Sequence, residues 1–283
     1  MPLEFSRMIS TIKNNLYKAV ISQSSRDIIK FLIILGLLFW LVSAGSEKLY
    51  YNWQWYRVKQ FIFTFDQGQF VPGLLLQGLW ITLKITGISL VLTFIFGLVA
   101  CLFRLSASIV ARFLSRSYVE TIRNTPLLVQ LLFNYFVLSP ILGISPFMTA
   151  VLTLSLFEGA YASEIIRAGI QSIDRGQWDS ARSTGLNNFQ TYFYIIIPQA
   201  YKFLLPPLTN QSVSLIKDSA LVSTIAIYDL TMQGQVIISN TFLTFEIWFT
   251  VAAIYLAIAL IITFLVTILE KYIQQGKPRT EKR

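Results

Sequence analysis

Histidine is missing from all 283 residues of this chain, and cysteine occurs only once, at Cys101. The missing histidine removes the commonest metal ligand and the commonest general acid or base of enzymes. A single cysteine excludes an intrachain disulfide framework and a cysteine-based metal cluster. The sequence also contains no G-x-x-x-x-G-K-[ST] segment, the loop that cradles nucleotide phosphates. We therefore expect no catalytic residues, no metal ion and no cofactor held by this chain itself.

Charged residues are scarce as well. Asp, Glu, Lys and Arg make up 13% of the chain, about half of the ~25% that is usual in soluble domains. Three long runs carry no charge at all: residues 85–103, 124–157 and 247–269, which are 19, 34 and 23 residues long. About 20 apolar residues cross a bilayer as a helix. The sequence therefore predicts an all-α fold, a polytopic membrane helix bundle.

The order of apolar, aromatic and basic segments divides the chain. Residues 1–30 are basic and amphipathic, which is typical of a helix lying on the cytoplasmic membrane surface. Residues 28–45 form a first membrane span and not a cleaved signal peptide, because this apolar run starts too late. Residues 46–74 are rich in Trp and Tyr, which suit the extracytoplasmic headgroup zone. The main transmembrane domain covers 75–272, and a basic cytoplasmic tail covers 273–283.

Five further spans are predicted inside the main domain. Ser-Pro steps at 139–140 and 145–146 mark a tight turn between two of them, because proline cannot continue a helix hydrogen-bond ladder. For the same reason, prolines are expected to interrupt the second-to-last span. The predicted spans are 76–103, 127–141, 147–166, one that starts near Tyr192 and contains Pro198, Pro206 and Pro207, and 246–269.

The distribution of positive charge predicts the orientation. If both termini are cytoplasmic, the inside segments 1–30, 104–123, 165–190 and 271–283 carry 17 Lys and Arg, whereas the outside segments carry 4. Such a bias follows the positive-inside rule. The net charge of +9 is thus spread along the membrane flanks and forms no face for nucleic acid. We expect a multi-pass plasma-membrane protein in contact with lipid and not with nucleic acid.

Residues 172–190 form a polar insert between two spans on the predicted cytoplasmic side. Polar side chains that cap helix starts, and a glycine that tolerates the left-handed conformation beyond a helix end, predict two short helices with an elbow between them. Such a compact knob suits docking on a soluble partner, or it is a structured connecting loop. The candidate caps are Ser172 or Asp174 for the first helix, Gly185 for its end beyond about Arg182, and Asn187 or Asn188 for the second helix.

The same insert resembles the EAA loop of ABC-importer permeases, whose pattern is E-A-A-x3-G-x9-I-x-L-P. Asp179-Ser180-Ala181, Gly185, Ile195 and Pro198 keep this spacing, with Asp for Glu, Ser for Ala and Ile197 for Leu. Four other segments are similar to the polar amino-acid branch of that family, the histidine/glutamine/arginine-type permeases. They are GLWITLKIT (78–86), IRNTPLLVQLLF (122–133), AYASEIIRAGIQSI (160–173) and IKDSALVSTIAIYDL (216–230). The resemblance covers about residues 74–272.

The resemblance implies a five-helix ABC importer permease core, to which this chain adds the N-terminal transmembrane helix over 28–45. It also implies a transport subunit and not an enzyme, placed in a bacterial plasma (inner) membrane and importing polar amino acids. A pair of ABC ATPase subunits would bind and hydrolyse the ATP. A second permease, identical or different, would complete the pathway, and an extracytoplasmic substrate-binding protein would deliver the amino acid.

Six residues of the loop are expected to couple the permease to its ATPase. A carboxylate near a helix end can meet a basic partner group, small residues allow a close approach, glycine forms the elbow and proline fixes a bend. Arg182 either pairs with the partner or with Asp179, or it is an ordinary solvated charge. The six residues are Asp179, Ser180, Ala181, Arg182, Gly185 and Pro198.

Polar side chains at membrane depth are the candidates for the substrate pathway, because placing them in lipid is costly. Glu158 is the leading candidate for contacting an ammonium group or a basic side chain. Its alternative role is a buried structural charge paired with another helix. The full set of candidates is Glu158, Glu164, Arg123, Asn124, Thr125, Gln130 and Asp218.

Three of these candidates also have structural interpretations. Glu164 can form an internal ion pair with Arg167, three residues further along the same helix. Arg123 can extend to the cytoplasmic boundary of the membrane. Asp218 can pair with Lys217 or lie at an outer gate.

Two other classes of function remain as alternatives. A channel or secondary carrier for small polar solutes, working without an ATPase, leaves the spacing of the loop unexplained. An intramembrane enzyme would need a metal cluster or a nucleophile–base pair, and the residues for neither are evident in this sequence.

Overall fold

The computed structural model describes residues 27–37, 40, 43, 45 and 51–275. The chain divides into two units, residues 1–53 and residues 54–283, and each is considered by itself. In the first unit, residues 27–37 are helical and exposed, which agrees with the predicted helix over 28–45 for that part. Most of the predicted amphipathic segment, which precedes residue 27, and most of the predicted tail, from residue 276, lie outside the described residues.

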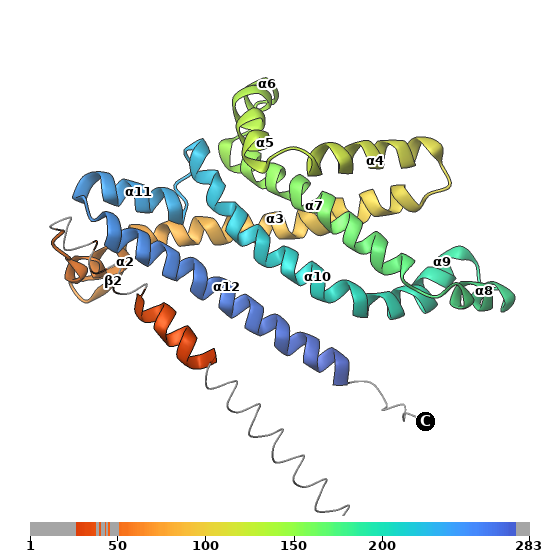
Figure 1. The fold of residues 1–283 in the computed structure, drawn as a ribbon. Coiled ribbons are helices and arrows are strands. Elements are labelled where there is room, and N and C mark those ends of the chain that lie inside the picture. The colour runs from red at the N-terminus through yellow and green to blue at the C-terminus, as the bar shows by residue number, and fades with distance from the viewer. Residues whose placement is uncertain (1–26, 38–39, 41–42, 44, 46–50, 276–283) are drawn as a thin grey trace, which may run out of the picture. The chain divides into compact units, whose positions relative to one another are not determined.

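The second unit begins with a small β-hairpin that the sequence did not predict (Figure 1). Its two strands are antiparallel, with Phe63 opposite Pro72. Gln67 and Gly68 connect them with φ values of 47° and 79°, and two positive φ values give a hairpin turn whose twist matches that of the strands. Apart from this hairpin, the regular elements of residues 51–275 are helical, as predicted. The elements of this part are η1 (Trp55–Arg57), α2 (Lys59–Ile62), β1 (Phe63–Asp66) and β2 (Gln69–Pro72).

Two long helices that run in the same chain direction pack together at the centre of the second unit. The Ser89 hydroxyl on one donates to the Val151 carbonyl on the other at 3.3 Å, and Gly97 lies further along, against Ala162. A Cβ atom on Gly97 would lie 2.8 Å from the Ala162 Cβ. Small residues at such positions let membrane helices approach closely. The two helices are α3 (Leu74–Leu105) and α7 (Pro146–Gln171).

The chain between these two helices is bent. Residues 127–142 are helical, as predicted for 127–141. They form a pair with residues 109–123 that is bent by 104°, a corner that the sequence did not predict. Pro126 stands at the corner in an extended conformation, and a proline disfavours helical geometry in the residue before it. The elements are α4 (Ile109–Arg123), α5 (Leu127–Phe133), the π turn η2 (Asn134–Leu138) and α6 (Ser139–Leu142).

The last helices follow the polar insert. Pro206 and Pro207 lie inside a helix that continues past them, so the predicted interruption of this span is wrong. Membrane helices tolerate interior prolines, because neighbouring helices and hydroxyl side chains satisfy the carbonyls that lose a partner. The elements are α8 (Arg175–Ser183), α9 (Asn188–Gln190), the π turn η3 (Thr191–Ile196), α10 (Ile197–Asp218), the 3-10 turn η4 (Ser219–Ile225), α11 (Leu230–Thr241) and α12 (Thr244–Gln275).

Several described helices are suited to a membrane. By length and composition, α3 and residues 244–268 of α12 can each cross it, and two bent pairs raise the number to four if each pair is one span. In the most apolar 18-residue stretch of α12, only 6% is buried inside the chain, as expected for a helix that faces lipid or another subunit. With 26 residues, α7 is also long enough, at about 39 Å, and its neighbours bury its polar groups.

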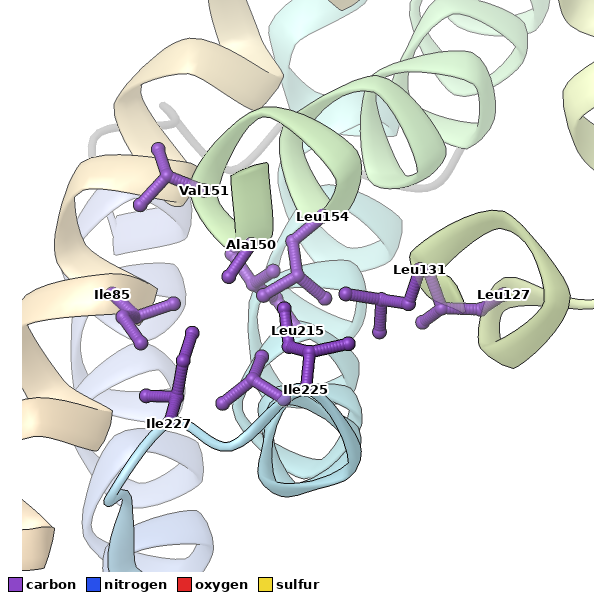
Figure 2. Close-up of a cluster of buried hydrophobic side chains, with 10 residues drawn as sticks. Ile85, Leu127, Leu131, Ala150, Val151, Leu154, Leu215, Ile225 and Ile227 are labelled. Carbon is purple, nitrogen blue, oxygen red and sulfur yellow. The ribbon is translucent and has the colours of Figure 1, made fainter. Parts of the chain in front are cut away.

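A buried apolar cluster joins the membrane helices. Ile85 from α3, Leu131 from α5, Leu154 from α7 and Leu215 from α10 meet there, together with Ile227 from the segment before α11 (Figure 2). Each of these side chains is at most 7% exposed. The cluster fixes the positions of α7 and α10, the two helices that carry the polar site described below.

Candidate coupling loop and intramembrane polar site

The first helix of the insert over 172–190 has a well-formed start. The Asp174 carboxylate caps α8 by accepting a hydrogen bond from the Gly176 N–H at 2.7 Å. A carboxylate at this position satisfies an N–H group that the first helical turn leaves free. The predicted cap is therefore confirmed, with Asp174 and not Ser172 in that role.

The end of α8 and the start of α9 form the predicted elbow. Gly185 has φ of 81°, and the Leu186 N–H donates to the Ala181 carbonyl at 3.2 Å, which is the pattern of a glycine-terminated helix. Asn187 and Gln190 then form a reciprocal capping box at the start of α9. Each end of the elbow is closed by local hydrogen bonds, so the loop is stiff without any partner.

One face of α8 is packed on the membrane helices. Trp178 lies edge-on to Tyr192 of η3, with 5.1 Å between ring centroids, and both rings pack on a cluster that includes buried Ile166 and Ile196. The Ala181 side chain is only 4% exposed. The close approach that the resemblance assigned to Ala181 therefore occurs within the chain, between α8 and its own bundle.

Five of the six predicted coupling residues are exposed: Asp179, Ser180, Arg182, Gly185 and Pro198. No ion pair of the described residues joins Arg182 to Asp179. Around Gly185, nothing lies within 4 Å of the place that a Cβ atom would take. The exposed face of the elbow thus offers a carboxylate, a hydroxyl and a guanidinium for contact with another protein.

Pro198 stands in the first turn of α10, directly after the π turn η3. A proline has no N–H for the helix ladder, and a π turn changes the hydrogen-bond register by one residue. The helical segment continues from residue 188 to residue 225. The structure therefore has a π turn directly before the position at which the sequence predicts a bend.

Glu158 lies near the middle of α7 and is 1% exposed. Gln211 of α10 donates a short hydrogen bond from its Nε2 to Glu158 Oε2. Asp218 lies at the end of the same helix as Gln211, seven residues further along. The other Glu158 oxygen, Oε1, is buried and has no hydrogen-bond partner among the described residues. The site is therefore a buried carboxyl group on α7 that is joined to α10 through Gln211.

Glu164 forms ion pairs with two arginines. Arg167 Nη2 lies 2.7 Å from Glu164 Oε2, so the predicted i,i+3 ion pair is confirmed. Arg104 of α3 adds a second guanidinium, with Nη1 at 3.8 Å from Glu164 Oε1. The carboxylate is thus balanced within the chain, between α3 and α7.

The polar residues after α4 hold the bend together. Asn124 donates to the Glu120 carbonyl at 2.7 Å, and Gln130 donates to the Thr125 hydroxyl at 2.7 Å. Arg123 reaches across to α7 instead, where its guanidinium lies 4.9 Å from the centre of the Tyr161 ring. Of the four substrate-pathway candidates in this segment, Arg123 is the one whose charged group contacts another membrane helix.

Comparison with known proteins connects these features. Residues 89–275 match the family described as "Binding-protein-dependent transport system inner membrane component". The chain belongs to this family. Membership confirms the resemblance inferred from the spacing of the loop.

Similar proteins include permeases named for the amino acids glutamine and cystine. The chain is 38% identical over 212 residues to the glutamine transport system permease protein GlnP of Escherichia coli. The match covers 73% of this chain and 97% of GlnP. The chain is 42% identical over 171 residues to the L-cystine transport system permease protein TcyB of Bacillus subtilis, covering 60% of this chain and 72% of TcyB. A chain of an amino acid ABC transporter, solved with histidines, is similar with a TM-score of 0.66 and 39% identity, covering 70% and 94% of the two chains.

Three residues of the polar site were not predicted from the sequence: Gln211, Tyr161 and Arg104. Gln211 precedes Asp218 by seven residues, a spacing that places both on one helix face, and this signal could have found it. Arg104 directly follows a 19-residue charge-free run. Its contact with Glu164 depends on the packing of α3 on α7, which a single sequence does not reveal.

Proposed function

We propose that this chain is the transmembrane permease subunit of an ATP-driven importer for polar amino acids. The observation that carries the proposal is the stiff elbow of α8 and α9, which has EAA-loop spacing, a packed face at Trp178 and an exposed face at Asp179 and Ser180. The names of the relatives support the substrate class, because they are permeases for glutamine and cystine.

The energy for transport comes from a partner in this proposal. The chain contains no phosphate-cradling G-x-x-x-x-G-K-[ST] segment, so a pair of ABC ATPase subunits binds the ATP and receives the loop over 172–190. A second permease completes the pathway, and an extracytoplasmic binding protein delivers the amino acid. The description of the family as binding-protein-dependent supports the last of these partners.

The elbow is connected to two membrane helices at once. Three residues, 172–174, separate it from α7, and α9 continues through η3 into α10. A movement that an ATPase imposes on α8 therefore reaches α7 and α10 together. Since the caps and the Trp178–Tyr192 contact hold the loop stiff, little of the movement is absorbed before it reaches the helices on which Glu158 and Gln211 lie.

Within the pathway, Glu158 and Arg123 are the residues most suited to an amino-acid zwitterion. Glu158 Oε1 has no hydrogen-bond partner in the part of the chain that the structure describes, and it can accept a hydrogen bond from an ammonium group. The Arg123 guanidinium is exposed and lies over Tyr161, one helical turn beyond Glu158, where it can meet a carboxylate. Glu164 stabilises the contact of α3 with α7, and Asn124, Thr125 and Gln130 shape the bend after α4.

The proposed setting is a bacterial plasma membrane, with the elbow and both termini on the cytoplasmic side. The excess of Lys and Arg in the segments on that side supports this orientation. In that arrangement, the β-hairpin lies on the extracytoplasmic side.

The proposal is tested with the assembled complex in proteoliposomes. Amino-acid uptake is expected to require both ATP and the binding protein. Asp179→Lys is expected to reduce co-purification of the ATPase, because it reverses the charge of the exposed face, whereas the same change at exposed Asp66 of the hairpin leaves co-purification unchanged. Uptake that proceeds at the same rate without nucleotide would overturn the proposal in favour of a channel or secondary carrier.

A further inference from the structure

A groove runs between α3 and α4 on the outside of the bundle. After the turn at residues 106–108, α4 returns along the last part of α3 (Figure 1). The Ser115 hydroxyl donates to the Ala100 carbonyl at 2.6 Å, and the Tyr118 hydroxyl donates to the Leu156 carbonyl of α7 at 2.6 Å. These bonds hold the three helices together beneath a groove of about 260 Å³. The other residues that line it are Phe96, Val99, Phe103 and Leu114.

The groove is apolar and opens away from the bundle. Phe103 of α3 and Leu114 of α4 are 46% and 55% exposed, although both line it. The first residues of α4 continue this apolar surface, because Ile109, Val110 and Phe113 are exposed as well. A large exposed apolar surface marks a contact with another protein or with a membrane.

One arginine is fixed at the end of the groove that is nearest the turn. Arg112 lies three residues before Ser115, on the same helix face. Its Nη1 donates to the carbonyls of Ser106 and Ala107, each at 2.9 Å. A guanidinium has five N–H donors, and Nη1 carries two of them. Three donors of Arg112 therefore remain for a ligand.

The charge of Arg112 also remains available. None of the ion pairs among the described residues includes Arg112. One helical turn further along α4, Arg116 differs, because its Nε lies 2.6 Å from Glu120 Oε1. Of these two arginines, Arg112 is the one that presents an unbalanced positive charge beside the apolar groove. A ligand that satisfies both features has a long apolar chain and an anionic group.

We infer that this groove binds an anionic phospholipid of the cytoplasmic leaflet, with an acyl chain against Val99, Phe103 and Leu114 and the phosphate at Arg112. Phosphate and guanidinium suit each other through paired N–H···O bonds. In the proposed orientation the turn at 106–108 lies on the cytoplasmic side, where anionic lipids give the leaflet a negative surface potential. A zwitterionic lipid fits the groove less well, because its own ammonium competes with Arg112 for the phosphate. The inference goes beyond amino-acid transport, since its ligand is a lipid.

The test is photo-crosslinking of lipids to the assembled permease–ATPase complex in phosphatidylcholine nanodiscs. Trace phosphatidylglycerol or phosphatidylcholine, each with the same diazirine-bearing acyl chain, is added, and the labelled peptides are identified by mass spectrometry. Residues 96–118 should be labelled at least threefold more by the phosphatidylglycerol probe. Residues 256–268 of α12, an apolar stretch without charged residues, should be labelled equally by both probes.

Matched variants separate the charge from the groove. Arg112→Gln should remove the threefold excess, whereas Arg116→Gln should keep it. Val99→Trp fills the groove and should lower labelling by the phosphatidylglycerol probe at least twofold. Leu98→Trp adds the same ring at an exposed position that does not line the groove, and it should leave the labelling unchanged. Co-purification of the ATPase shows that each variant assembles.

Four results would overturn the inference. They are equal labelling of residues 96–118 by the two probes, an excess that survives in Arg112→Gln, and labelling by neither probe, which would mean that another subunit covers the groove. The fourth is loss of the excess when glycerol phosphate is added, because the site would then bind a phosphate group and not a lipid. ATP-driven glutamine uptake is measured separately in proteoliposomes, so the proposed function stands if this inference alone fails.

Discussion

Trp178 of α8 packs edge-on against Tyr192 of η3, with 5.1 Å between their ring centroids. This contact joins the cytoplasmic elbow to the helical segment that continues into α10. It lies between the exposed residues that would meet an ATPase and the membrane helices that would move. The stiffness of the elbow therefore depends on tertiary packing as well as on its caps.

Replacing Trp178 with alanine is expected to uncouple transport from ATP hydrolysis. The change removes an aromatic contact worth about 0.5–1.5 kcal/mol beyond its buried area and lets α8 move independently of α10. Uptake per ATP hydrolysed should fall about fivefold or more, since about 1 kcal/mol corresponds to that factor. Trp178→Phe retains a ring and should keep most of the coupling. A coupling ratio that is unchanged in Trp178→Ala would show that the contact is dispensable.

Replacing Gly185 with valine is expected to have a similar effect for a different reason. The φ of 81° at Gly185 is strained for a residue with a side chain, at a cost of about 1–2 kcal/mol, so the elbow must change its backbone. ATPase assembly and membrane insertion are measured beside uptake, and only uptake should be lost. Gly185→Asn is the matched control, because asparagine tolerates the left-handed conformation. Normal uptake by the valine variant would refute this role of the elbow.

The close contact of α3 with α7 makes a prediction about stability. Gly97→Ala would bring a Cβ atom to 2.8 Å from the Ala162 Cβ, and such overpacking costs about 1–3 kcal/mol. The Tm of the detergent-solubilised complex should fall by about 2–4 °C for each kcal/mol. Gly87→Ala lies on the same helix with nothing within 4 Å of the added atom, and it should leave the Tm unchanged or raise it. Equal effects of the two changes would mean that the helices separate easily at Gly97.

The orientation can be measured with introduced cysteines, because the native Cys101 is fully buried. Gln67, in the turn of the hairpin, and Ser180, on α8, are both exposed. A membrane-impermeant maleimide added to intact cells should label Gln67→Cys, and it should label Ser180→Cys only after permeabilisation. The reverse pattern would place the elbow outside and contradict the proposed function.

The elements that the sequence predicts correctly depend on local chemistry. Asp174 caps a helix by bonding two residues ahead, and Gly185 ends it with a backbone conformation that suits glycine. Such features need no knowledge of the rest of the fold. The long apolar runs are equally direct, since hydropathy alone indicates α3 and α12 as membrane helices.

The features of the fold that were predicted wrongly or not at all have physical explanations. The corner at Pro126 was not predicted, because it lies within a charge-free run and hydropathy does not reveal the direction of a chain. Pro206 and Pro207 break helices in water, but α10 continues through them because other groups in a membrane bundle satisfy the backbone. The hairpin was missed because its strands lie within an aromatic segment that also fits the headgroup zone, and its turn places the non-glycine residue Gln67 at a positive φ.

The polar site was predicted only in part, because its geometry depends on contacts between distant residues. Glu158 and Gln211 are 53 positions apart, and nothing near either residue indicates the other. The burial of Glu158 could be inferred from the apolar run around it. The contact of Gln211 with Glu158 follows only from the way in which α7 packs on α10.

The π turn η3 over Thr191–Ile196 has a consequence for the evolution of such chains. A π turn holds one residue more than an α-helical turn, so the loss of a single residue there can be absorbed when the π turn becomes an α-helical turn. Gln211 would then stay on the side of Glu158. Two relatives that differ by one gap at this place can therefore still present the same side chains from α10.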